Sequence, residues 1–332
     1  MSSQAKKSMS NHLKSLAKLY GGFSNYKGTV SVGGKEWPIS HAVFSNTKGR
    51  LTNKVSLALL NIISRLSRVH LVGNTAVPCF SQVEDLEPWK DVHLRKDNPC
   101  GIYIINTFSG KIEGVPHYLS IPADPMMVLH IRAKWDSFDD YLDAFTSKYR
   151  VRAKKILKET DELETQEYMG SEIDDETLAL IAGLLKKTLA GKTLTMSSDL
   201  ASVLKNYIKS FGDNYRIRIY SSNGNPLGFI GFVLMEQSLT AMHIGFHTPE
   251  KQNMPIYQRM LYGLVYYAIE SKLESVNFGR TAVEIKSCLG AVPVRNYFIA
   301  LIRFPWICAF SNMYKNIFYK PKEYTIRSPF KS

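Results

Sequence analysis

Several residues that could move protons lie in the last third of the chain, at the ends of predicted elements. His247 closes a predicted strand just before a segment that leads into a helix. An imidazole in such a place can titrate near neutral pH and can accept or release a proton. Tyr257 begins that helix and offers a phenol as a proton donor. His243 precedes His247 by four positions and shares its strand face. The alternatives are a histidine bonded at a sheet edge and a tyrosine in the helix core.

Candidate anion-binding residues follow the predicted strand at 275–279. Arg280 comes directly after Gly279 at a strand-to-helix turn, where free backbone N–H groups favour a phosphate or a carboxylate. Glu284 and Lys286 lie on the next short helix, two positions apart, so their side chains point in different directions. We expect no ion pair between them, which leaves each to bind another group. Structural salt bridges at Arg280 and Lys286 are the alternative.

Two pairs of arginines extend the possible anion-binding surface. Arg216 and Arg218 alternate on one face of a predicted strand and either line a channel for an anionic substrate or face solvent. Arg150 and Arg152 lie in the basic run SKYRVRAKK, which has no acid. Guanidinium groups bind phosphate bidentately, so this run suits a phosphorylated donor or a lipid headgroup. A solvated helix face is the alternative.

Composition bounds the class of protein. The chain has 332 residues, of which 45% are hydrophobic and 11% aromatic, which is globular and excludes whole-chain disorder. The formal charge of +13 favours anionic partners, such as nucleic acid, a phosphorylated donor or an anionic membrane surface. Four cysteines form no CxxC pair, and HExxH and Ser-His-Asp arrangements are absent, so we predict no disulfide framework and no metal site.

Membrane insertion and export are not expected. Lysines near the N-terminus have no apolar run behind them, which argues against a signal peptide. The most apolar stretch, 297–310, is interrupted by Arg303 and Pro305 and is too short to span a bilayer. We therefore expect an intracellular protein that can touch a surface.

Hydrophobic periodicity predicts the elements that position these residues. In the first half it predicts a helix at 51–67, strands at 69–72, 101–108 and 125–132, and a long helix that Ser137 caps. In the second half, a hairpin signal at Asn223-Gly224 joins two of three consecutive strands. The second-half elements are helices at 174–190, 197–211, 254–273 and 281–289, and strands at 215–220, 226–235, 238–247, 275–279 and 297–302. This order predicts an α+β fold with a mostly antiparallel sheet.

The charge pattern predicts the domain organisation. Nine acids and no base lie between residues 159 and 176, which is typical of a linker. We predict a basic N-terminal tail (1–20), an N-terminal α/β domain ending in the long helix (21–160) and a C-terminal domain with a basic, aromatic tail (165–332). The pentapeptides GNTAV (73–77) and GRTAV (279–283) each follow a predicted helix and strand, which suggests that the first domain is a degenerate copy of the second.

Three segments resemble a known family. They are WDSFDDYLDAFTSKYRVRAKK (135–155), YQRMLYGLVYYAIE (257–270) and NFGRTAVEIKSCLGAVPV (277–294). Their sequences and their order along the chain resemble those of the GNAT-like acyltransferases related to the FemAB peptidoglycan aminoacyltransferases. The resemblance implies a GNAT-like α+β fold, with two GNAT-like units in tandem. It also implies an acyltransferase that joins an activated acyl or aminoacyl donor to a primary amine, on an envelope precursor or a lipid.

The candidate residues divide between two roles in such a reaction. His247, Tyr257 and Glu284 are the catalytic candidates, of which His247 and Tyr257 would handle the proton. Donor or acceptor binding falls to the basic residues Arg280, Lys286, Arg216, Arg218, Arg150 and Arg152.

The donor stays open at this point. GNAT enzymes that use coenzyme A bind its pyrophosphate with a glycine-rich loop that opens the central helix. Here that stretch is HTPEKQNMPIYQRM (247–260), with no glycine between Phe246 and Gly263. We expect no tightly bound cofactor, and the donor is acyl-coenzyme A, acyl-carrier protein or aminoacyl-tRNA. Nucleic acid is a partner only in the last case.

The C-terminal segment suggests a location. From Ala291 onward it has seven Lys or Arg and one acid, together with ten aromatic residues. This composition is typical of a membrane interface, so we expect a cytoplasmic protein at the inner face of the cell membrane. A last core strand with a basic tail is the alternative. The rival function is an inactive GNAT-like module that binds RNA or anionic lipid through its basic surface.

Overall fold

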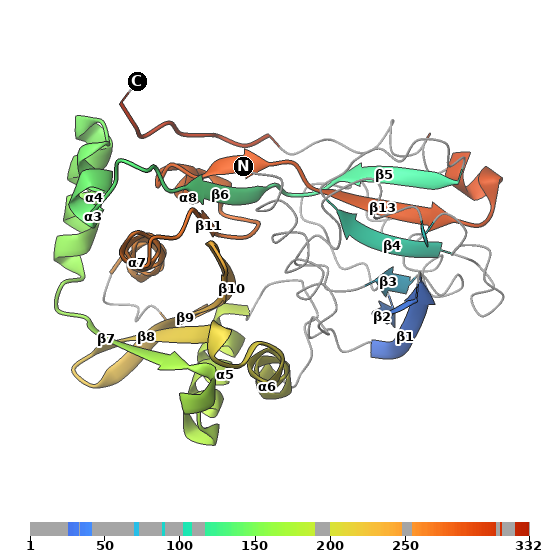
Figure 1. Ribbon diagram of the computed structural model, residues 1–332, viewed down its shortest axis with the longest axis horizontal. Coiled ribbons are helices and arrows are strands. Elements are labelled where there is room, and N and C mark those ends of the chain that lie inside the picture. Colours follow the sequence, from blue (N-terminus) through green and yellow to red (C-terminus); the bar gives the residue numbers. More distant parts are fainter. Residues whose placement is uncertain are drawn as a thin grey trace. The chain divides into compact units, whose positions relative to one another are not determined.

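The computed structural model describes residues 26–32, 34–41, 70–72, 88–89, 102–107, 117–189, 200–247, 254–309, 313 and 323–331. The chain divides into two compact units, each with its own sheet (Figure 1). Unit 1 comprises residues 1–124, 192–199 and 295–323, and unit 2 comprises residues 125–191, 200–294 and 324–332. The predicted helix at 51–67 and the pentapeptide at 73–77 lie outside the described residues.

The sheet of unit 1 has six described strands in the order β1-β2-β3-β4-β13-β5. Their bounds are β1 Tyr26–Val32, β2 Lys35–His41, β3 His70–Val72, β4 Ile102–Thr107, β5 Tyr118–Pro122 and β13 Tyr297–Ile302. Strand β13 lies between β4 and β5 and pairs antiparallel with both. Its Ile299 and Leu301 are fully buried, so 297–302 is a core strand, as its apolar sequence predicts.

The sheet of unit 2 has seven strands in the order β12-β6-β11-β10-β9-β8-β7. Their bounds are β6 Met126–His130, β7 Glu164–Met169, β8 Tyr215–Ser222, β9 Asn225–Met235, β10 Ser238–Phe246, β11 Ser275–Asn277 and β12 Val292–Val294. Every pair is antiparallel except β10 with β11. The mostly antiparallel sheet and the three consecutive strands β8, β9 and β10 are confirmed.

Helices cover both faces of the unit 2 sheet (Figure 1). On one face lie α5 Asp175–Leu189 and α6 Leu200–Phe211, with the 3₁₀ turns η3 Gly170–Glu172 and η4 Gly212–Asn214 nearby. On the other lies α7 Ile256–Glu270, against which α3 Phe138–Asp143 and α4 Ser147–Glu159 pack. The short helix α8 Val283–Ser287 follows β11. Apolar residues of α7 are fully buried on this face, which forms the larger core of the unit.

The division between the units differs from the predicted boundary at 160–165. Strand β6 lies inside the unit 2 sheet, where Leu129 pairs with Val276 of β11. Helices α3 and α4 pack on α7, so they also belong to unit 2. The acidic stretch is not a linker, because residues 164–169 form β7, the edge strand beside β8. Residues 295–323 belong to unit 1 because β13 pairs there.

The predicted long helix from Ser137 is two helices. Ser137 caps α3 as expected, since its hydroxyl accepts from the backbone N–H of Asp140. The break follows α3 because the C-terminal segment hydrogen-bonds to the backbone there. Thr146 N–H donates to the Pro329 carbonyl at 2.8 Å, and Lys331 N–H donates to the Ala144 carbonyl at 3.0 Å.

This docking places Phe330 in an aromatic cluster with Trp135, Tyr141 and Phe145. Gly290 lies directly beneath the ring. Its φ of +89° is in the left-handed region, and a Cβ there would lie 2.1 Å from the Phe330 ring. Gly290 is therefore required both by the backbone conformation and by the packing of the C-terminal segment.

We expect Gly290→Ala to lower the free energy of unfolding by about 2 kcal/mol or more, since the added methyl overpacks the Phe330 site and strains the backbone. Urea unfolding followed by circular dichroism measures the change. Gly183→Ala is the matched control. Gly183 is in α5, and a Cβ there meets no atom within 4 Å, so alanine should leave stability unchanged or raise it slightly. Equal stability of the two variants would contradict this packing.

Candidate functional site

Strands β10 and β11 separate after a short stretch of parallel pairing. They pair only over 238–240 and 275–277. Strand β10 continues to Phe246 after a bulge at Ala241–His243, whereas β11 ends at Asn277. Within the described residues, no strand pairs with the β11-facing edge of β10 beyond Thr240. Backbone groups on that edge are available to a ligand.

The chain that leaves β11 makes a strained turn beside this opening. Gly279, Thr281 and Ala282 have φ values of +73°, +69° and +47°. Thr281 and Ala282 carry side chains that disfavour the left-handed region, so each costs roughly 1–3 kcal/mol. Strain of this kind persists only where surrounding contacts hold it, and it is common at functional sites.

The side chain of Lys286 fixes the backbone of this turn. Its Nζ donates to the Arg280 carbonyl at 2.7 Å and to the Gly279 carbonyl at 3.2 Å. The Asn277 side chain accepts from the Gly279 N–H at 2.9 Å. Lys286 is only 2% exposed. Its ammonium therefore donates to two successive carbonyls of the turn.

Burial also changes the acidity of Lys286. Desolvation lowers its pKa to about 7, and the neighbouring Arg280 charge lowers it in the same direction. A lysine with this pKa exchanges its proton near neutral pH. The site therefore contains an amine that is partly uncharged under physiological conditions.

Arg280 and Glu284 lie on the same strand-turn-helix segment. Arg280 is half-buried at the turn. Glu284 is exposed on α8, and its Oε1 accepts from Arg327 Nε at 3.0 Å. Glu284 thus binds the C-terminal segment, whereas Lys286 binds the turn.

His247 and Tyr257 flank the chain between β10 and α7. His247 has an exposed side chain, and its backbone N–H donates to the Leu227 carbonyl at 2.8 Å. Tyr257 is half-buried on the first turn of α7, with its ring centroid 5.9 Å from that of Phe246. Burial raises the pKa of Tyr257 to about 12, so its phenol keeps its proton at neutral pH.

His243 points to the face of the sheet that α6 covers. Its Nδ1 lies 3.1 Å from the Tyr215 hydroxyl, and its ring packs edge-on against Tyr207 at 4.6 Å. Burial lowers the pKa of His243 to about 4, so it is neutral at physiological pH. This is the structural alternative considered for a histidine on this strand.

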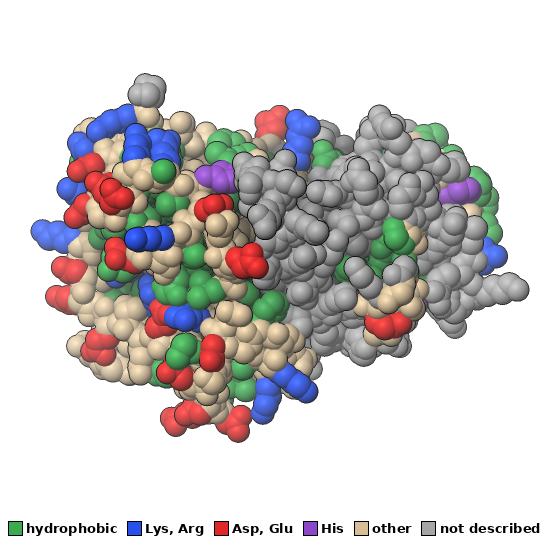
Figure 2. Space-filling model, viewed as in Figure 1, with side chains coloured by type: hydrophobic (Ala, Val, Ile, Leu, Met, Phe, Trp, Pro, Cys, Tyr) green, Lys and Arg blue, Asp and Glu red, His purple; other side chains and the backbone are tan. Residues whose placement is uncertain are grey.

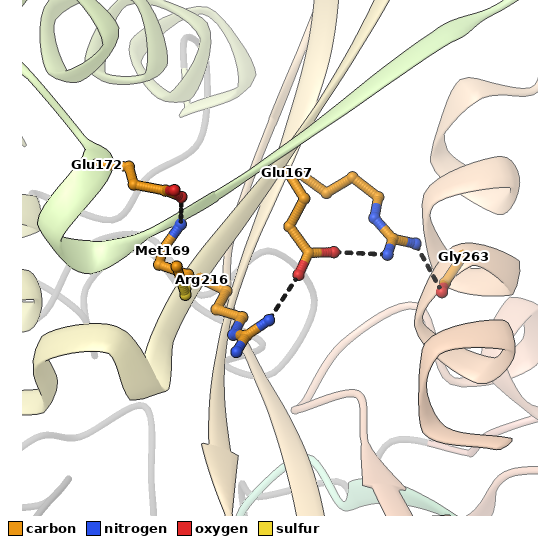
Figure 3. A network of polar contacts seen from close by, with 6 residues as sticks. Glu167, Met169, Glu172, Arg216 and Gly263 are labelled. Carbon is orange, nitrogen blue, oxygen red and sulfur yellow. Dashed lines mark hydrogen bonds and ion pairs between the residues drawn. The ribbon is translucent and has the colours of Figure 1, made fainter. Parts of the chain in front are cut away.

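Arg216 and Arg218 form a network with Glu167 of β7 (Figure 3). Glu167 Oε1 binds Arg216 Nη1 at 3.0 Å, and Oε2 binds Arg218 Nη2 at 2.6 Å. Arg218 Nη1 also donates to the Gly263 carbonyl of α7 at 3.1 Å. The Arg218 side chain is 14% exposed, so this strand face is covered and not solvated.

The arginines do not converge on the Arg280 turn. Strands β9 and β10 separate β8 from β11, a distance of about 14 Å across the sheet. On α4, Arg150 pairs with Asp143 at 3.5 Å. Arg152 Nη1 lies 3.9 Å from Cys288 Sγ, which places it beside the end of α8. The candidate residues thus lie in three places on unit 2.

A cleft of about 460 Å³ lies next to the Arg218 network and contains residues that sequence reasoning missed. Tyr220 of β8 and Arg259 of α7 line it, whereas Arg280 does not. One sequence signal points to this place. Gly263 lies inside the predicted helix at 254–273, and a glycine in a helix interior often indicates close approach of another group.

Comparisons with solved structures identify the fold. The C-terminal domain of a protein named as a lysylphosphatidylglycerol synthetase, from Agrobacterium fabrum, aligns with a TM-score of 0.53 at 10% identity, over 95% of this chain and 97% of that one. L-PGS from Bacillus licheniformis aligns with a TM-score of 0.51 at 13% identity, over 93% of each chain. FemX aligns with a TM-score of 0.51 at 11% identity, over 96% of this chain and 99% of that one.

The chain has a GNAT-like fold, which it shares with FemX. The alignments extend over both units, which confirms the predicted α+β fold with two GNAT-like units. No protein-family model and no curated protein sequence matches this chain. The GNAT-like arrangement is therefore visible in the order of elements and in the short segments that resemble the family.

The pH dependence of stability tests the buried position of Lys286. A solvated lysine side chain has a pKa of 10.5, whereas the pKa of Lys286 in the folded chain is about 7. Between these values the unfolded chain binds more protons, so the free energy of unfolding increases with pH. We expect wild type to gain stability relative to Lys286→Met between about pH 7 and pH 10.

Urea unfolding at several pH values measures this difference. Lys209→Met, which changes an exposed lysine on α6, is the control and should show no comparable pH dependence. A difference between wild type and Lys286→Met that is flat, or that falls with pH, would contradict the lowered pKa of Lys286.

Proposed function

We propose that this protein is an acyltransferase that forms an amide between an activated acyl or aminoacyl donor and a primary amine. The observation that carries the proposal is the opening between β10 and β11, bordered by the strained turn that Lys286 holds. It occurs in a chain whose fold is shared with FemX, with L-PGS from Bacillus licheniformis and with the domain from Agrobacterium fabrum that is named as part of a lysylphosphatidylglycerol synthetase.

In the proposed step, the donor carbonyl lies along the free edge of β10, where backbone N–H groups stabilise the developing oxyanion. The amine nitrogen attacks the carbonyl carbon, a C–N bond forms, and the C–S or C–O bond to the leaving group breaks. His247 accepts the amine proton, and the Tyr257 phenol protonates the leaving group. Alignment of the two bound reactants supplies much of the acceleration.

Arg280 binds an anionic group of the donor or acceptor, because it is a half-buried guanidinium at the turn beside the opening. Lys286 supports it by holding the Gly279 and Arg280 carbonyls. Glu284 has no part in this step, since its carboxylate is paired with Arg327 at the surface.

The donor is an activated ester or thioester. The segment that leads into α7 and the first turns of that helix contain no glycine, from His247 to Tyr262. This disfavours a pyrophosphate-binding loop of the kind that coenzyme A requires. This supports aminoacyl-tRNA or acyl-carrier protein over acyl-coenzyme A. The name of the Agrobacterium neighbour refers to an aminoacylated lipid, and this supports a lipid or an envelope precursor as the acceptor here.

Transfer assays with the full chain test the function. Purified protein is incubated with radiolabelled acyl-coenzyme A, acyl-carrier protein or aminoacyl-tRNA and an amine-bearing lipid, and amide formation is measured. We expect transfer from at least one donor and a loss of about a hundredfold in kcat/KM for Arg280→Ala, because a charge-assisted contact is removed. Lys209→Ala is the control. Lys209 is exposed on α6, on the other face of the sheet from α7, so this variant should retain full activity.

Transfer from none of the three donors would indicate a non-catalytic binding module. Full activity of Arg280→Ala would show that the site is not at the turn that follows β11. A normal circular dichroism spectrum of the variant distinguishes loss of the site from loss of the fold.

The protein is also proposed to act at the inner face of the cell membrane. No helix in the described ranges is long and apolar enough to cross a bilayer. Figure 2 shows acidic and basic side chains interspersed on the visible face of unit 2, so that face is not uniformly positive. The C-terminal segment of unit 1 is the better candidate. It carries Trp306, which is 70% exposed, and Arg303, which lies over the Phe304 ring.

Liposome sedimentation tests this location. We expect binding to vesicles with anionic lipid at low salt and release at high salt, because each Lys or Arg near an anionic surface contributes about 1 kcal/mol and salt screens the attraction. Trp306→Ser should weaken binding several-fold by removing apolar burial at the interface. Sedimentation with neutral vesicles is the control. Absence of binding to anionic vesicles at low salt would contradict the proposal.

A further inference from the structure

The cleft beside the Arg218 network has the form of a small-molecule site. Its volume of about 460 Å³ falls in the usual range for such sites. It lies within unit 2, between α3 and α4, the edge strand β7 with its neighbour β8, and α7. Its lining includes Phe138, Leu157, Glu167, Arg218, Tyr220 and Arg259.

Two polar groups at this cleft are buried and have no acceptor for their proton in the described part of the chain, although the Arg218 guanidinium lies beside the Tyr220 oxygen. They are the Tyr220 hydroxyl and the Arg259 Nε. Tyr220 is fully buried, at 0% exposure, so water does not replace the missing partner from the bulk. Buried polar groups nearly always have a partner, so two donors without an acceptor are unusual at the wall of a cleft.

The charge at the cleft is positive. Glu167 is fully engaged, because one oxygen binds Arg216 and the other binds Arg218. No described carboxylate pairs with Arg259, whose guanidinium carbon lies 5.7 Å from the centre of the Tyr220 ring. An unpaired guanidinium next to a phenol favours an oxyanion, because both groups donate hydrogen bonds to it.

A glycine makes the arrangement possible. Gly263 is in the interior of α7, where glycine costs about 1 kcal/mol relative to alanine. A Cβ at this position would lie 2.2 Å from the Tyr220 hydroxyl oxygen. The helix therefore accepts an unfavourable residue where the hydroxyl approaches it, and the Gly263 carbonyl fixes Arg218 at the same point.

The opposite wall of the cleft is apolar. Phe138 and Leu157 line it, together with Tyr266, which is 48% exposed at the surface. The rings of Phe138 and Tyr266 lie edge to face, with centroids 5.7 Å apart. A ligand with an apolar or aromatic body can pack on these rings while its anionic group faces Arg259.

We propose that this cleft binds a small oxyanion, a carboxylate or a phosphate ester with an apolar or aromatic body, through Arg259 and the Tyr220 hydroxyl. Strands β9 and β10 separate the cleft wall on β8 from the opening at β11, so this site is distinct from the one proposed for acyl transfer. The inference is independent of transfer activity.

Isothermal titration of the full chain tests the site with three anionic probes: phenyl phosphate, benzoate and hexanoate. Benzyl alcohol is the neutral comparison. We expect saturable binding of at least one anion and none of benzyl alcohol. Arg259→Gln should weaken that binding about ten- to a hundredfold, because a charged donor is lost. Arg295→Gln removes the same charge from an exposed position outside the cleft and should leave the affinity unchanged.

Tyr220→Phe separates ligand binding from folding. Removing a buried hydroxyl whose proton has no acceptor should leave the thermal midpoint of the unliganded protein unchanged or raise it, while anion affinity falls several-fold. The proposal is overturned if wild type binds none of the three anions, if benzyl alcohol binds as tightly as they do, or if Arg259→Gln binds them with wild-type affinity. A carboxylate-only or phosphate-only response supports the site and identifies its ligand class.

Discussion

Strand β6 is the constraint on which the β11 turn and its surroundings in unit 2 depend. It lies between β11 and β12 and pairs with both, and its Met126, Met127 and Leu129 are buried. Its backbone also fixes the chain beyond β11. Met127 N–H donates to the Gly279 carbonyl at 3.1 Å, and the Met127 carbonyl accepts from Phe278 N–H at 2.9 Å. The strained turn and the lysine beneath it therefore rest on a strand from a distant part of the sequence.

Local patterns predicted most of the elements, because each leaves a short-range signal. The Asn223-Gly224 turn and the alternation in 215–220 indicated the β8–β9 hairpin, and helical periodicity indicated α5, α6 and α7. The position of β6 in the unit 2 sheet has no such signal, since strand pairing between distant segments depends on the whole sheet. For the same reason, a run of acids resembled a linker although Glu167 belongs to a paired edge strand.

The site was predictable only in part. The spacing of Arg280, Glu284 and Lys286 indicated that the last two face different ways, and the structure gives them different partners. It did not indicate that Lys286 binds backbone carbonyls, because nothing in Thr281 or Ala282 favours a left-handed conformation. Tyr220 and Arg259 lie on elements far apart in sequence, so only the packing of β8 against α7 reveals that they meet.

The place of β6 in the sheet also has a consequence for biosynthesis. Its partner β11 follows about 150 residues later, which corresponds to roughly 7–30 s of translation. During that time the nascent segment MMVLH has hydrophobic side chains and unpaired backbone groups but no completed sheet to receive it. The emerging chain is thus exposed to aggregation until its last third leaves the ribosome, and chaperone contact in this interval would favour correct folding.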